Sequence, residues 1–190
     1  MKQRVLGALG ACLAVFLAIF AVGFLSARDA CAHDPRFVCS PRSTARPVIV
    51  DDPQKSWAFY GHLRPGEEDH YRIEVRKPLH VPWSLLIDAR DTGNPARPEA
   101  ILYDGTGRRL AQLDLVRPVR FYEPFSRERY LSSRAAVLDL LPGTYAAVVR
   151  MRGGDSSQRY TLAIGESEQF SLTEIPYVLG AIARIRALHY

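Results

Sequence analysis

The sequence predicts an all-β fold: an antiparallel, jelly-roll-like β-sandwich of about eight or nine strands, with an apolar N-terminal segment before it and an amphipathic helix after it. Short runs rich in β-branched and aromatic residues recur along the chain, bounded by Gly, Pro and Asp turns. The stretch 138–165 shows three such runs in succession. No helical periodicity separates the runs, which argues against alternating β and α units.

The N-terminal segment 1–27 begins with basic residues and continues as an uncharged, mostly apolar run from Val5 to Ala27. That run is long enough to cross a bilayer and exceeds the roughly 7–15 apolar residues of a cleavable signal. We therefore expect a signal anchor that leaves the domain on the periplasmic or extracellular side of the cell membrane. The motif Ala30-Cys31-Ala32 keeps the alternative open, a cleaved signal peptide and a secreted or periplasmic protein.

Residues 28–46 are polar and aperiodic, which favours a linker. Within it, Cys31 and Cys39 are close enough in sequence to form a disulfide loop in an exported protein. Cleavage after Ala32 would remove Cys31, so the disulfide depends on retention of the anchor.

The sandwich is expected to span 47–166. Its clearest strand contains Tyr71, Ile73 and Val75, which alternate with polar residues as in a half-buried strand. The turn 104–107 (Asp-Gly-Thr-Gly) between two apolar runs predicts a hairpin. Loops are expected at 90–98 and 115–133, the second with a short strand near 119–122. The other expected strands cover 47–50, 56–63, 80–88, 99–103 and 108–113.

The C-terminal segment 167–190 changes to a period of three and four residues, which predicts a helix. Its apolar stripe can pack on the sandwich or lie on the bilayer with its basic end at the headgroups. In the second case the candidate membrane contacts are Ile175, Val178, Leu179, Ile182, Arg184, Ile185 and Arg186.

The region from Trp57 to Gly165 resembles the bacterial pre-peptidase C-terminal domain, a small β-sandwich of exported proteins. The matching segments are Gly61–Leu63, Gly66–Val75, Ile101–Gly105, Leu141–Val149 and Arg159–Ile164. The resemblance implies a non-catalytic accessory module and, in some relatives, binding of calcium or an extracellular polymer. Asp69 matches an acidic position of the family. Calcium needs several oxygen ligands, and the candidates here are Asp51, Asp52, Glu67, Glu68 and Asp69.

No nucleophile elbow, zinc-protease motif or phosphate loop occurs in the sequence. The net charge of +5 is spread along the chain, so a nucleic-acid partner is not expected. We predict a non-catalytic, membrane-anchored extracytoplasmic module without an assigned ligand. The membrane is its expected partner, together with an envelope protein or extracellular polymer. The alternative is a small hydrolase that uses Glu123, set among aromatic residues, or one of His62, His70 and His80.

Overall fold

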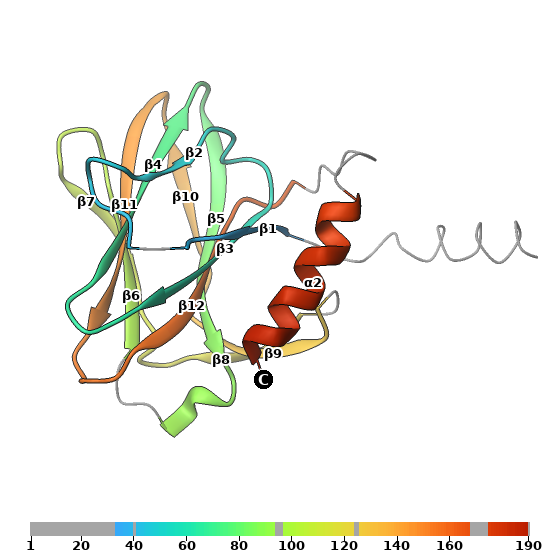
Figure 1. Ribbon diagram of the computed structural model, residues 1–190. Helices are drawn as coiled ribbons and strands as arrows, with labels where there is room; N and C mark the ends of the chain where they lie inside the picture. The colour runs from blue at the N-terminus through green and yellow to red at the C-terminus, as the bar shows by residue number, and fades with distance from the viewer. Residues whose placement is uncertain (1–32, 40, 94–96, 124–125, 168–174, 190) are drawn as a thin grey trace, which may run out of the picture. The chain divides into compact units, whose positions relative to one another are not determined.

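The computed structural model describes residues 33–39, 41–93, 97–123, 126–167 and 175–189. In these ranges the chain forms two β-sheets and one long helix (Figure 1). The elements are β1 (Asp34–Phe37), β2 (Val48–Val50), β3 (Trp57–Leu63), β4 (Glu68–Val75), β5 (Leu79–Asp88), the 3₁₀ turn η2 (Asp91–Gly93), β6 (Arg97–Tyr103), β7 (Arg109–Leu113), β8 (Val119–Glu123), β9 (Glu128–Ser132), β10 (Ala136–Leu140), β11 (Gly143–Arg152), β12 (Gln158–Ile164) and α2 (Ile175–His189).

The two sheets form a β-sandwich. One sheet has the order β1-β3-β12-β5-β9-β8, with β10 also paired to β5, and the other has the order β2-β4-β11-β6-β7. Strands β11 and β12, which the stretch 138–165 supplies, lie near the centre of opposite sheets. This stretch therefore contributes a central strand to each layer.

The core lies between the sheets, and apolar side chains from both fill it. Tyr71, Ile73 and Val75 of β4 are all buried, as their alternation predicts. They belong to one cluster with Trp83 of β5 and Leu162 of β12. Complete burial of a side chain the size of isoleucine contributes about 1.5–3 kcal/mol.

Two turns fix strand register through side chains. The Asp104 carboxylate accepts hydrogen bonds from the backbone amides of Thr106 and Arg108, and it pairs with the Arg108 guanidinium. The Tyr145 hydroxyl donates to the Leu141 carbonyl at 2.8 Å and accepts from the Leu141 amide at 3.1 Å. The predicted hairpin and the turn before β11 are both confirmed.

The structure corrects the sequence prediction at several places. Twelve strands are present in the described ranges, and two pairs, β1 with β3 and β2 with β4, are parallel. Strand β1 lies inside the expected linker, and β9 lies inside the expected loop 115–133. The expected linker also binds to β4 at Arg42. The Arg42 amide donates to the Asp69 carboxylate, and the His70 amide donates to the Arg42 carbonyl.

The expected anchor 1–27 lies outside the described residues. Among the residues that the structure does describe, no helix is both long and apolar enough to span a membrane.

Candidate functional site

Helix α2 packs on the sandwich beside β1 (Figure 1). Ala181 and Ile185 are buried at this contact, and the Tyr177 hydroxyl donates a 2.9 Å hydrogen bond to the Pro35 carbonyl of β1. Further along the helix, Arg186 Nε donates to the Ser126 carbonyl at 3.1 Å. The sequence allows α2 to pack on the sandwich or to lie on the bilayer, and the described side chains of α2 pack on the sandwich.

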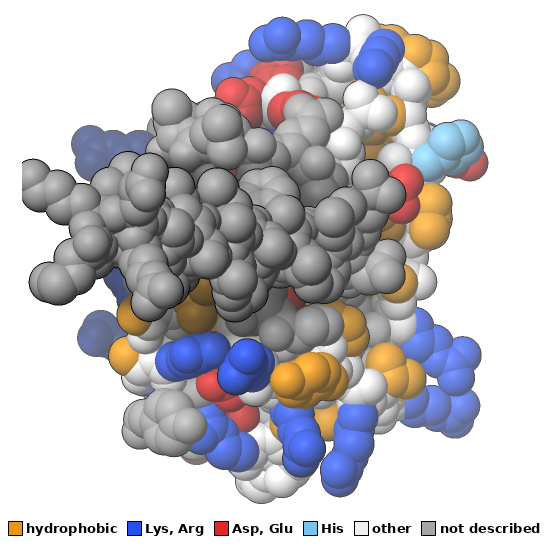
Figure 2. Space-filling view, turned by 90° about the vertical axis from the view of Figure 1, so that its right-hand side faces the viewer, with side chains coloured by type: hydrophobic (Ala, Val, Ile, Leu, Met, Phe, Trp, Pro, Cys, Tyr) orange, Lys and Arg blue, Asp and Glu red, His pale blue; other side chains and the backbone are white. Residues whose placement is uncertain are grey.

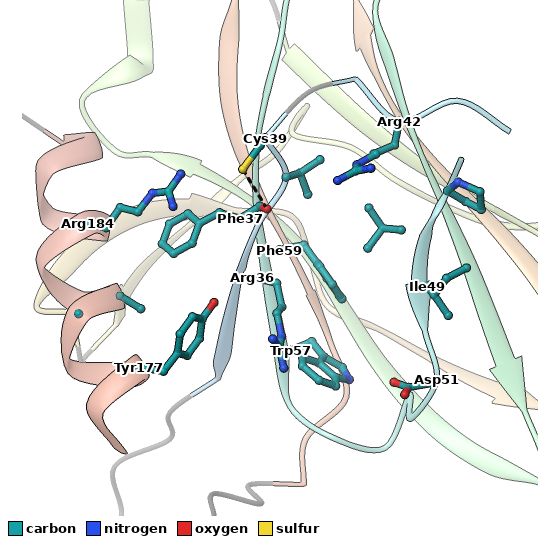
Figure 3. Close-up of a pocket in the computed structure, with 15 residues that line it drawn as sticks. Arg36, Phe37, Cys39, Arg42, Ile49, Asp51, Trp57, Phe59, Tyr177 and Arg184 are labelled. Carbon is teal, nitrogen blue, oxygen red and sulfur yellow. Dashed lines mark hydrogen bonds between the residues drawn. The ribbon is translucent and has the colours of Figure 1, made fainter. Parts of the chain in front are cut away.

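A cavity of about 870 Å³ lies between α2 and strands β1, β2 and β3, and we call it the α2 groove (Figure 3). Its lining is mostly aromatic, aliphatic and basic. The lining residues are Arg36, Phe37, Val38, Cys39, Arg42, Pro47, Val48, Ile49, Asp51, Trp57, Phe59, Tyr177, Gly180, Ala181 and Arg184. Its size is in the range of small-ligand sites.

One wall of the groove is a stack of cations on aromatic rings. Asp34, which is 2% exposed, accepts ion pairs from Arg36 at 3.2 Å and Lys55 at 2.8 Å. The Arg36 guanidinium lies 4.8 Å from the Trp57 ring centroid and 5.7 Å from that of Tyr177. A paired, buried carboxylate and two ring faces thus hold Arg36 in one position.

Two other arginines lie on opposite sides of the groove. The Arg184 guanidinium stacks 4.0 Å from the Phe37 ring centroid. The Nε atom of Arg42 is buried without a hydrogen-bond partner among the described residues. In Figure 3 the two side chains lie on either side of Phe37 and Cys39, and each extends towards them. The surrounding face carries prominent Lys and Arg side chains in its lower half, interspersed with hydrophobic ones (Figure 2).

A smaller cavity of about 350 Å³ lies on the outer face of the β3–β12–β5 sheet and shares Phe37, Val38 and Arg184 with the α2 groove. The hydroxyls of Tyr60 and Tyr130, which line it, share a hydrogen bond. Burial raises the pKa of Tyr130 to about 12. Both phenols therefore stay neutral at physiological pH, and neither provides a base.

Glu123 lies at the end of β8, where its carboxylate accepts the Ser126 amide of the β8–β9 turn. It lines neither of the two cavities. Of the three candidate histidines, His62 lines the smaller cavity, His70 pairs with Glu68 and His80 pairs with Asp139. Glu123 therefore faces no histidine across either cavity, and His62 is the one hydrolase candidate that lines one of these two cavities.

Asp69 has a structural position. It is 1% exposed, and its carboxylate accepts a 2.7 Å hydrogen bond from the Tyr160 hydroxyl and one of the same length from the Arg42 amide. The Tyr71 hydroxyl donates in turn to Tyr160 at 2.7 Å. Burial raises the pKa of Asp69 above its ordinary value, although these hydrogen bonds partly oppose the change.

The five calcium candidates do not converge. Asp51 lines the α2 groove, whereas Asp52 and Glu67 accept backbone amides in their own turns and Glu68 pairs with His70. Across the part of the chain that is described, no three acidic, His or Cys side chains lie close enough to hold a metal ion. The five carboxylates are therefore not gathered into one cluster in this part of the chain, and calcium binding by any of them stays a prediction.

Cys39 is exposed, and no described cysteine is bonded to it. Its expected partner, Cys31, lies outside the described residues, so the disulfide stays a prediction.

The membrane-contact candidates divide into three sets. Ile185 is 2% exposed against the sandwich and has no surface to offer a bilayer. Arg184 and Arg186 are exposed, and Ile182 is partly so. The side chains of Ile175, Val178 and Leu179 are outside the described set. Membrane contact by the residues other than Ile185 stays a prediction.

Sequence reasoning singled out Arg184, Asp51 and Cys39 but not the groove in which they meet. It missed Arg36, Arg42, Trp57 and Tyr177 as site residues. The one available signal was a high density of aromatic and basic residues in two segments, 36–59 and 177–186, separated by most of the chain.

No family model and no curated relative matches the sequence. Solved structures do match it. The pre-peptidase C-terminal domain of a collagenase from Bacillus anthracis aligns with 70% of this chain and 96% of its own, at 13% identity and a TM-score of 0.39. Such a domain is thus among the structures that this chain is similar to, in agreement with the resemblance in the sequence.

Two carbohydrate-binding modules also match. One, from Cellvibrio japonicus, aligns with 56% of this chain and 69% of its own, at 9% identity and a TM-score of 0.35. The other, from a Cellvibrio mixtus lichenase and in complex with cellotriose, aligns with 56% and 75%, at 7% identity and a TM-score of 0.33. Similarity this distant does not transfer a ligand or a binding residue to this chain.

Proposed function

We propose that this chain is an exported, membrane-anchored, non-catalytic module with a jelly-roll-like sandwich, and that it binds an extracellular polymer in the α2 groove. The observation that carries the proposal is the groove itself. It offers about 870 Å³ lined by aromatic rings and arginines. Ligand-binding sites commonly combine apolar surface with a few oriented polar groups in this way.

The distribution of acidic groups supports binding over catalysis. Many of the described acids accept hydrogen bonds in turns or form ion pairs, and Asp69 belongs to its buried network. Asp51 is the one acid among the groove residues. General acid–base chemistry needs an acid or base held within hydrogen-bond reach of the proton that it transfers, and no hydrogen bond or ion pair within the described residues holds Asp51 in this way. Export and anchoring rest on the apolar run 5–27.

Gly180 of α2 allows a specific test. It lines the groove, and a Cβ atom at this position would have open space on every side. Gly180→Trp should therefore fill part of the groove without disturbing the packing of the helix. Ala183, one turn away, is exposed and does not line the groove. Ala183→Trp is a matched control because it adds the same ring to the same helix.

The full-length chain, purified in a neutral detergent, should be retained on at least one immobilised polymer from a panel of cellulose, chitin, β-glucan, pectin and a phosphorylated mannan. Retention should fall at least tenfold for Gly180→Trp and change less than twofold for Ala183→Trp. The proposal would be overturned if the chain bound none of the polymers, or if the two tryptophan variants were retained equally.

A further inference from the structure

The α2 groove is lined by more arginine side chains than carboxylates. Three arginines line it (Arg36, Arg42 and Arg184), against the single carboxylate of Asp51. Arg36 has its own counterion in Asp34. Within the described residues, Arg184 lies over the Phe37 ring and Arg42 has a buried Nε without a hydrogen-bond partner. The buried Asp69 carboxylate interacts electrostatically with Arg42, so Arg184 is the less compensated of the two.

Arg184 is oriented although it is exposed. Its Cζ atom lies over the Phe37 ring, 4.0 Å from the centroid, and Phe37 is in turn stacked on Tyr60 with centroids 5.5 Å apart. Stacking occupies the face of a guanidinium and leaves its N–H edge available for a planar oxyanion. An arginine held in this way loses less side-chain entropy when it binds a carboxylate or phosphate.

Arg42 contributes from the opposite wall. Its backbone is fixed by two hydrogen bonds, to Asp69 and from His70. Its buried Nε atom is without a hydrogen-bond partner in the part of the chain that is described. An unsatisfied buried donor costs about 1–3 kcal/mol, so the position of this side chain is not explained by hydrogen bonding at Nε within the described residues. Both arginine side chains line the same cavity (Figure 3).

We infer that the ligand of the α2 groove is an anionic glycan whose carboxylate or phosphate groups are bound by Arg184 and Arg42. The inference rests on the proposed function and names the class of polymer. Aromatic residues at the groove, with Tyr177 45% exposed, supply apolar surface for a sugar ring beside the charged group. A neutral polymer would offer neither arginine a counterion.

The test compares polymers that differ only in charge. Polygalacturonate is set against its methyl ester, and a phosphorylated mannan against unmodified mannan, each titrated onto the immobilised full-length chain. Binding of an acidic polymer, at least tenfold tighter than of its neutral counterpart and weaker with added NaCl, supports the inference. The acidic polymer that binds identifies the oxyanion as a carboxylate or a phosphate.

Arg184→Gln and Arg42→Gln should each weaken that binding about tenfold, as expected for loss of a charge-assisted hydrogen bond. Arg76→Gln is the matched control, because it removes the same charge from an exposed position that does not line the groove. Its effect should stay within twofold.

Equal effects of all three substitutions would overturn the inference, as would absence of binding to both acidic polymers. Equal binding of neutral and acidic forms that Gly180→Trp still abolishes would overturn the inference too, while leaving the proposed polymer-binding function intact.

Discussion

The buried carboxyl group of Asp69 joins three parts of the chain. Its oxygens accept from the Arg42 amide and from the Tyr160 hydroxyl of β12, and Tyr71 of β4 donates to Tyr160. Because β4 and β12 belong to different sheets, the network connects the two layers. Gly61 belongs to the same arrangement, since a Cβ atom there would overlap the Tyr160 ring. Glycine at 61 thus allows Tyr160 to reach Asp69.

Asp69→Asn should change how stability depends on pH. Burial raises the pKa of Asp69 in the folded state above its unfolded value near 3.9. Between these two values the folded state binds the extra proton, so this group's contribution is largest below about pH 4 and is lost as the pH rises through the folded pKa. A tenfold difference between the two acid constants corresponds to about 1.4 kcal/mol. Asparagine does not titrate, so the variant should lack this decline.

Urea unfolding of both proteins from about pH 4 to 7 measures the effect as a difference between the two unfolding free energies. The variant also replaces an acceptor of two hydrogen bonds with an amide, which adds a roughly pH-independent cost of about 1 kcal/mol. Asp155→Asn, in the exposed turn before β12, should leave the profile unchanged. A constant difference between the proteins at every pH would refute the expected linkage.

At the scale of elements, the sequence is most informative where one strand or turn determines its own structure. Strand β4 alternates because one of its faces is buried, and the β6–β7 hairpin follows from the turn chemistry of Asp104 to Gly107. Strand β1 has no such pattern. It is held by parallel pairing with β3 and by the ion pairs of Asp34, and both depend on residues distant in sequence.

The sequence did not predict the α2 groove because its residues also come from segments that are distant in sequence. Its arginines lie on β1, on the segment after it and on α2, and they meet only because α2 packs beside β1. The pattern of α2 allowed packing on protein or on lipid, since an apolar stripe satisfies both. Only tertiary contacts, such as that of Tyr177 with Pro35, distinguish the two.

Truncation of two isoleucines on α2 should separate these alternatives. Ile185 is 2% exposed, so Ile185→Ala should lower the free energy of unfolding by about 2–4 kcal/mol through lost burial and a residual cavity. Ile182 is only partly buried, and Ile182→Ala should cost roughly 1 kcal/mol or less. Urea unfolding of the detergent-purified chain, followed by tryptophan fluorescence, measures both. Small and equal costs would indicate that α2 is not packed on the sandwich.

For the molecule as a whole, the oxidation state of Cys39 depends on whether the N-terminal segment 1–27 is retained or cleaved. Cys39 is exposed and lines the α2 groove, and no described cysteine is bonded to it. If the segment 1–27 is retained, Cys31 remains available to pair with Cys39 in an oxidising compartment. If the chain is cleaved after Ala32, Cys39 remains as a single reactive thiol. Anchoring, export and oxidation therefore form one prediction.

We expect the full-length protein in the membrane fraction, with Cys39 protected until a reductant is added. Cys12 lies in the apolar run and would add a background signal, so the experiment uses Cys12→Ser. A maleimide polymer added to separated fractions should shift the protein on a gel only after reduction, and then by two additions, because Cys31 and Cys39 are released together. Cys31→Ser should allow one addition without reductant. A shorter, soluble species that takes one addition before reduction would instead show cleavage. The α2 groove would then belong to a released protein, and the Cys39 thiol beside its ligand would be free to react.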